Sequence, residues 1–204
     1  SEMCIRDSFL FIAYLCLSIK RLIVMNPLDI IAKYYPVGSE AYRILVIHSR
    51  SVADKALAIA RMHPEMNLDL TFVEEAAMLH DIGIFRCNAP DIDCHGDAEY
   101  ICHGYLGAEL MRAEGYPRHA RVCERHTGTG ITLAMIEERG LPLPHRDFMP
   151  ETLEEQLICY ADKFYSKTKL DKEKSVEKVK QGLSKYGNET VERFDNWCKL
   201  FLGE

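Results

Sequence analysis

Apolar residues recur at three- and four-residue intervals through most of the chain, which is the spacing of amphipathic helices. No segment shows the strict alternation of a half-buried β-strand, and no internal repeat is present. The pattern predicts an all-α fold, a single helical bundle with a C-terminal helical extension. The expected helices cover about 27–35, 39–59, 72–81, 100–114, 117–126, 131–139 and 152–165, with two more after them.

Polar residues before these segments indicate where the helices begin. Ser39 is placed to cap the second helix, and the pairs Thr71–Glu74 and Thr152–Glu155 have the spacing of a capping box. A charged run precedes the last two helices, and we assign those helices to packing and not to chemistry.

The first 24 residues differ in pattern from the rest of the chain. Their apolar run is interrupted by Lys20 and Arg21, well short of the roughly 20 residues that a membrane helix needs. No small-residue cleavage site of a signal peptide comes after the run. We expect 1–24 to be a non-native or leader segment, with a short membrane-associated leader as the alternative. The domain then covers 25–166, and the C-terminal extension covers 167–204.

Length, charge and cysteine content narrow the class of protein. The 204 residues suffice for one domain and are too few for two comfortable ones. A net charge of -6 argues against the coating of duplex nucleic acid, which needs clustered lysine and arginine. The eight cysteines include no C-x-x-C pair, which favours reduced thiols and a cytoplasmic location. We expect no membrane and no duplex nucleic acid as partners, and the oligomeric state stays open.

Candidate chemistry centres on His80 and Asp81, which end an apolar helical run shortly before Gly83. Burying an ionised carboxylate is costly unless a cation or hydrogen bonds compensate it. Further histidines and aspartates lie on or beside apolar helical stripes, and each alone is explained by a hydrogen-bonded core side chain. These further residues are His48, His103, His126 and Asp162.

Together, these six residues indicate a metal centre, because helical bundles build metal sites from side chains on facing helices. Histidine and carboxylate without thiolate suit iron, manganese or cobalt, and also zinc. Two such ions about 3.5–4 Å apart can activate water and polarise a phosphoryl oxygen. We expect two divalent transition-metal ions bridged by the two oxygens of Asp81, and we place catalysis on Asp81 and His80.

Three cations neighbour these residues in the sequence: Arg86, Arg125 and Lys163. Each carries a charge suited to phosphate, and we predict that they bind the substrate. The alternative for each is a solvated surface charge. The polar loop at 88–96 fits no zinc spacing and is interpreted as solvated.

The arrangement resembles a known family. The order His48, His80-Asp81, Asp162 is similar to the signature of the HD-domain metal-dependent phosphohydrolases, and His80 to Gly83 matches the HDIG variant. The resemblance covers about 39–165. It implies that the four signature residues bind a first metal in an all-helical, HD-domain-like bundle.

The additional His103 and His126 resemble the subset of that family with a dinuclear centre, and their surroundings are similar to those of the symmetrical diadenosine tetraphosphatases. Ile84 stands where many HDIG proteins have a lysine, so the usual phosphate contact is absent or shifted to Arg86. His126 is followed by Thr127 and no GYP motif occurs, unlike in the cyclic-di-GMP phosphodiesterases. The long loop before His103 leaves the substrate open.

These observations predict a metal-dependent phosphohydrolase, an enzyme that hydrolyses a phosphomonoester or phosphoanhydride of a nucleotide-like small molecule. One alternative is a non-catalytic nucleotide-sensing module, and the intact set of six ligands argues against it. The other is a dinuclear iron oxygenase, because a similar centre can activate oxygen. Oxygen consumption would distinguish that case.

Overall fold

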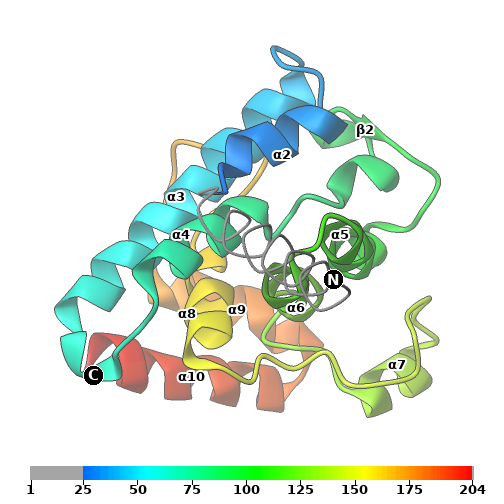
Figure 1. Cartoon of the computed structure of the whole chain (residues 1–204). Helices are drawn as coiled ribbons and strands as arrows, with labels where there is room; N and C mark the ends of the chain where they lie inside the picture. The colour runs from blue at the N-terminus through cyan, green and yellow to red at the C-terminus, as the bar shows by residue number, and fades with distance from the viewer. Residues whose placement is uncertain (1–24, 204) are drawn as a thin grey trace, which may run out of the picture.

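The computed structural model describes residues 25–203, so the predicted leader at 1–24 lies outside the described part of the chain. Within it the fold is all-α, as predicted, and Figure 1 shows helices packed around one another. The helices are α2 (Pro27–Tyr34), α3 (Glu40–Met62), α4 (Leu70–Leu79), α5 (His103–Ala113), α6 (Pro117–Arg125), α7 (Leu133–Arg139), α8 (Leu153–Asp162), α9 (Val176–Leu183) and α10 (Asn188–Leu202).

One continuous hydrophobic core joins most of these helices. Helix α3 packs against α4 and α8, and α5 packs against α6 (Figure 1). The C-terminal helices belong to the same core, because Phe194 and Phe201 are fully buried and their rings contact Tyr160 of α8. Helices α9 and α10 therefore pack on the other helices through their apolar faces.

The predicted N-terminal caps agree with the structure except at one helix. Ser39 caps α3, and Thr152 forms the predicted capping box with Glu155 at α8. The capping box predicted for Thr71 is wrong. Asp69 caps α4 instead, accepting a hydrogen bond from the backbone N–H of Phe72 at 3.1 Å, and the helix begins at Leu70. Aspartate is the stronger of the two capping residues.

The loop at 88–96 contains two short strands that the sequence pattern did not indicate. Strand β1 (Asn88–Ala89) pairs antiparallel with β2 (Cys94–His95). Strands of two residues are too short to show an alternation of polar and apolar positions. No helix in the described residues 25–203 is long and apolar enough to cross a membrane. The six cysteines in that range are free thiols.

Glycines allow α5 to approach the end of α4 very closely. A Cβ atom on Gly83 would lie 2.3 Å from the backbone nitrogen of Gly107 and 2.3 Å from the carbonyl oxygen of His103. A Cβ atom on Gly104 would lie 2.5 Å from the carbonyl oxygen of Cys123 in α6. Backbone contacts of this kind hold the ends of α4, α5 and α6 together. They position the histidines described below.

We expect Gly83→Ala to destabilise the protein and to weaken its metal binding. The added methyl group must displace α5, and overpacking of this kind costs about 1–3 kcal/mol or more. Denaturant unfolding and metal analysis would measure both effects. Gly182→Ala in α9 is the matched control, because its Cβ would meet nothing within 4 Å. A Gly83→Ala protein with wild-type stability and metal content would contradict this role of the glycine.

Candidate metal centre

The structure brings all six candidate ligands together, from five helices. His48 lies within α3, His80 and Asp81 follow α4, and Asp162 ends α8. The other two histidines lie at the start of α5 and directly after α6. All six side chains are buried: His48, His80, Asp81, His103, His126 and Asp162.

The first group of ligand atoms surrounds Oδ2 of Asp81. Nε2 of His48 lies 3.1 Å from this oxygen, and Nε2 of His80 lies 2.9 Å from it. Oδ1 of Asp162 completes the group, at 3.0 Å from Nε2 of His48 and 3.5 Å from Nε2 of His80. Four potential ligand atoms thus face a common point.

The second group uses the other oxygen of Asp81. Nε2 of His103 lies 3.4 Å from Oδ1, and Nε2 of His126 lies 3.3 Å from the same atom. The two histidine nitrogens are 3.0 Å apart. Ligands bound at about 2.0–2.1 Å to one tetrahedral metal are separated by about 3.4 Å, and the distances in both groups are of this size. Asp81 is the residue common to both groups.

Backbone carbonyls fix the tautomer of three of the histidines. Each Nδ1 donates to the carbonyl oxygen three residues earlier, so that Nε2 is the nitrogen left to face the centre and to bind a metal. These bonds join His80 to Ala77 at 2.6 Å, His103 to Tyr100 at 2.6 Å and His126 to Cys123 at 2.7 Å.

Several of these buried ligand atoms have no hydrogen-bond partner among the described residues. Nε2 of His48, Nε2 of His80 and Oδ1 of Asp81 make no hydrogen bond in the described structure. Buried polar atoms without partners are strongly unfavourable. A cation between them would give each of these atoms a partner, so the donor set fits a divalent metal.

The charges of the site also suit a cation. Burial would raise the pKa of the Asp81 and Asp162 carboxyls, but adjacent positive groups outweigh it and hold both well below the usual value. Burial lowers the pKa of His103 to about 3 and also lowers the pKa of His126, so both rings are neutral. Ionised carboxylates and neutral imidazoles are the forms that bind metal.

His80 predicts a pH dependence for the metal-free protein. Burial alone would lower its pKa, but the charges of Asp81 and then Asp162 raise it from 6.5 to about 9. A raised pKa in the folded state stabilises the protein fully below the unfolded value, and this contribution is lost as pH rises through the folded value. Between pH 6.5 and 9, we expect metal-free stability to fall by up to about 3 kcal/mol.

Metal affinity should rise over the same pH range, because the metal replaces the proton on His80. Thermal unfolding with and without a chelator, together with metal titration at each pH, would measure both trends. His80→Gln removes the titrating group and should flatten the metal-free trend. Wild-type metal-free stability that stays constant or rises over this range would contradict the assignment.

Two lysines contact the candidate ligands. Nζ of Lys163 lies 2.8 Å from Oδ2 of Asp162 and donates to the carbonyl oxygen of His126 at 2.9 Å. Nζ of Lys167 lies 2.7 Å from Oδ2 of Asp81. Sequence reasoning assigned no chemistry to Lys167, because a run of charged residues after a helix is typical of a solvated surface. The one feature of the sequence that places Lys167 near the centre is its short distance along the chain, five residues, from the candidate ligand Asp162.

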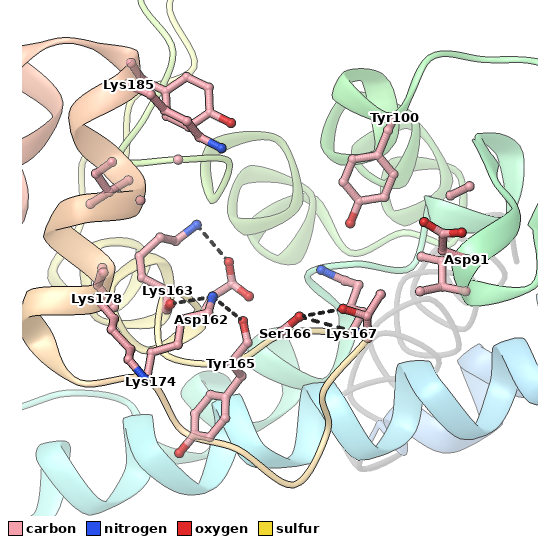
Figure 2. Close-up of a pocket in the computed structure, with 18 of the residues that line it drawn as sticks. Asp91, Tyr100, Asp162, Lys163, Tyr165, Ser166, Lys167, Lys174, Lys178 and Lys185 are labelled. Carbon is pink, nitrogen blue, oxygen red and sulfur yellow. Dashed lines mark hydrogen bonds and ion pairs between the residues drawn. The ribbon is translucent and has the colours of Figure 1, made fainter.

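A cavity of about 670 Å³ opens beside the centre. Figure 2 shows Lys178 and Lys185 on one wall, and Asp91 and Tyr100 on the opposite wall. Five lysines line it: Lys163, Lys167, Lys174, Lys178 and Lys185. Two carboxylates also line it, from Asp91 and Asp162, in a chain whose net charge is -6. The lining of the cavity is therefore locally positive, in contrast to the chain as a whole.

Of the three predicted substrate-binding residues, only Lys163 lines this cavity. Arg125 is buried, lies 3.7 Å from Glu155 and donates to the carbonyl oxygen of Met149 at 3.0 Å. Arg86 is on the surface, 4.0 Å from Glu109. The structure does not bring either arginine to the cavity, because other side chains and the backbone hold them elsewhere.

The chain has relatives among known families and proteins. The profile of the HD domain family matches residues 45–166, and the chain belongs to this family. The chain is also similar to the uncharacterized protein MJ0778 of Methanocaldococcus jannaschii. The two are 37% identical over 128 residues, which cover 61% of this chain and 68% of that protein.

Two further relatives are named tRNA (cytidine(56)-2'-O)-methyltransferase. The one from Thermoplasma volcanium is 33% identical over 140 residues, covering 68% of this chain and 35% of that protein. The one from Picrophilus torridus is 31% identical over 149 residues, covering 72% of this chain and 37% of that protein. The chain thus spans about a third of the length of these curated relatives.

Solved structures similar to this one include the HD domain of the L. monocytogenes phosphodiesterase PgpH. That structure has a TM-score of 0.47 and 15% identity, covering 83% of this chain and 93% of the other. The same domain in complex with cyclic-di-AMP has a TM-score of 0.48 and 15% identity, covering 84% of this chain and 94% of the other.

Proposed function

We propose that this chain is a metal-dependent phosphohydrolase that hydrolyses a phosphoester or phosphoanhydride of a nucleotide-like small molecule. The observation that carries the proposal is the position of Asp81, whose two oxygens face two separate groups of buried ligand atoms. His48, His80, Asp81 and Asp162 would hold one divalent ion, and Asp81, His103 and His126 would hold a second. When bound, such ions supply a nucleophilic hydroxide near neutral pH and neutralise charge on a phosphoryl group.

The residues of the chain prepare this site in three ways. The backbone carbonyls at positions 77, 100 and 123 orient the imidazoles, so that Nε2 of each ring faces the centre. Lys163 bridges Asp162 and the carbonyl of His126, which holds the end of α8 against the end of α6. Lys167 places its ammonium group between Asp81 and the cavity, where it would contact an oxygen of the phosphoryl group.

The lysine-lined cavity favours hydrolysis of a phosphorylated substrate over the oxygenase alternative. An oxygenase acting on a neutral alcohol would leave the ammonium groups of Lys178 and Lys185 without anionic partners, whereas a phosphorylated substrate would pair with them. The same cavity fits a nucleotide sensor, so turnover is what separates an enzyme from a binding module. We expect duplex nucleic acid to be a poor substrate, because the described cavity is local and the chain is acidic.

The test is a phosphate-release screen with protein stripped by a chelator and reloaded with iron, manganese or cobalt. Its substrates are nucleoside phosphates, diadenosine polyphosphates and an RNA oligonucleotide with a 3'-phosphate, since two relatives carry tRNA methyltransferase names. We expect metal-dependent release from at least one small substrate. Oxygen uptake is followed in the same samples. Turnover that survives metal removal, or none on any phosphoester with both sites loaded, would overturn the proposal.

A further inference from the structure

The five lysines that line the cavity differ in whether their ammonium groups already have partners within the protein. Lys163 and Lys167 are paired with Asp162 and Asp81, at 2.8 Å and 2.7 Å. Lys174 donates to the backbone carbonyl oxygen of Lys163 at 3.2 Å and to that of Tyr165 at 3.1 Å (Figure 2). These lysines hold the loop between α8 and α9 against the metal centre. Their ammonium groups have partners before any ligand arrives.

Lys178 and Lys185 are different, and we call them the distal lysines. Lys178 lies on α9 and Lys185 lies on the short 3-10 helix η5 (Ser184–Tyr186). Both line the cavity, and neither has a carboxylate within 4.0 Å in the described part of the chain. Lys185 contacts the ring of Tyr186, at 5.0 Å from its centroid. The distal lysines therefore place two positive charges without a carboxylate partner on the wall formed by α9 and η5.

A neighbour on the same helix shows the contrast. Lys180 is ion-paired with Asp195 at 2.7 Å and does not line the cavity. Of these two lysines on helix α9, Lys180 is paired within the protein and Lys178 lines the cavity. Since lysine is a compact charge with three donors, it is suited to a phosphate group as partner.

We propose that the distal lysines bind a second phosphate group, so that the substrate class is a compound with two or more linked phosphates. This inference rests on the proposed function, in which the first phosphoryl group lies at the metal centre beside Lys167. A substrate with one phosphate at that centre leaves the distal lysines unpaired. A nucleoside diphosphate, nucleoside triphosphate or dinucleoside polyphosphate supplies anionic oxygens at both places. The distal lysines are then specificity-determining residues.

The test compares Lys178→Gln/Lys185→Gln with Lys180→Gln/Lys199→Gln. Both double variants remove two positive charges from exposed or half-buried positions, but only the first pair lines the cavity. For a substrate with linked phosphates, the distal pair should raise KM by roughly tenfold or more and leave kcat nearly unchanged. KM for the corresponding monophosphate should stay the same. The control pair should change neither value.

A binding measurement separates this inference from the proposed function. Calorimetry on metal-free protein would compare tripolyphosphate with orthophosphate. We expect tripolyphosphate to bind more tightly, and the distal pair of substitutions should remove that difference. If this holds and no phosphoester is hydrolysed, the second-phosphate site stands and the proposed function fails. If hydrolysis occurs but the distal substitutions affect monophosphates and linked phosphates alike, or neither, the inference is overturned.

Discussion

Asp81→Asn should remove both metal ions and reduce phosphate release by more than about 100-fold. Loss of a residue that only hydrogen-bonds to a metal ligand costs about 10- to 100-fold, and the loss of a ligand itself should cost more. In the structure, Oδ2 of Asp81 faces His48 and His80, and Oδ1 faces His103 and His126. An asparagine keeps the shape but replaces one oxygen with an NH₂ group, and it removes the negative charge from both groups. The second group then loses its only anionic ligand, and the first group keeps a single one, Asp162.

Metal analysis and phosphate release on the same preparation would check this expectation, with circular dichroism to confirm the fold. Asp91→Asn is the matched control, because Asp91 lines the same cavity and belongs to neither ligand group. Full metal content and rate in Asp81→Asn would show that the carboxylate does not bridge two ions.

His126→Ala should lose one of two metal ions and keep the other. His126 belongs only to the group formed with Asp81 and His103, whereas the other group retains its four ligands. The remaining pair of side chains is too small a set to hold an ion tightly, because metal sites in enzymes normally use three or more protein ligands. We expect the metal content to fall from two ions per chain to one, and the rate to fall at least about tenfold. His103→Ala should behave in the same way.

His119→Ala is the control for this experiment. His119 is a buried histidine on α6, the helix that His126 directly follows. Its Nε2 lies 3.3 Å from Glu75, and it is not a member of either ligand group. Its substitution should lower stability without changing the metal content of the folded protein. A wild-type protein that saturates at one ion, or a His126→Ala protein that still binds two, would contradict the dinuclear assignment.

The helices and the ligand candidates could be predicted from the sequence because both depend on local patterns. His48 lies on an apolar stripe, and His80 and Asp81 lie at a helix end that Gly83 marks. That these residues meet at one site was inferred from their number and from the resemblance to a family. Spacing alone does not say which helix ends lie close together. The close contact of Gly83 with Gly107 is a tertiary contact, which the local sequence pattern does not show.

The cavity could not be predicted, because it depends on how the chain returns after α8. The run from Lys167 to Lys174 has the composition of a solvated loop, yet Lys167 reaches Asp81 and Lys174 is anchored to backbone carbonyls. Arg125 shows the reverse case. It neighbours a candidate ligand in sequence, but an ion pair with Glu151 at 2.5 Å and the backbone of Met149 hold it away from the cavity.

The dependence of hydrolysis on two metal ions is tested most directly by titrating metal into chelator-treated protein. The rate of phosphate release is then plotted against the number of metal ions bound per chain. We predict no release without metal and a rate that rises until two ions are bound per chain. A rate that does not depend on metal content, or no release from any phosphorylated substrate at two ions per chain, would contradict this prediction.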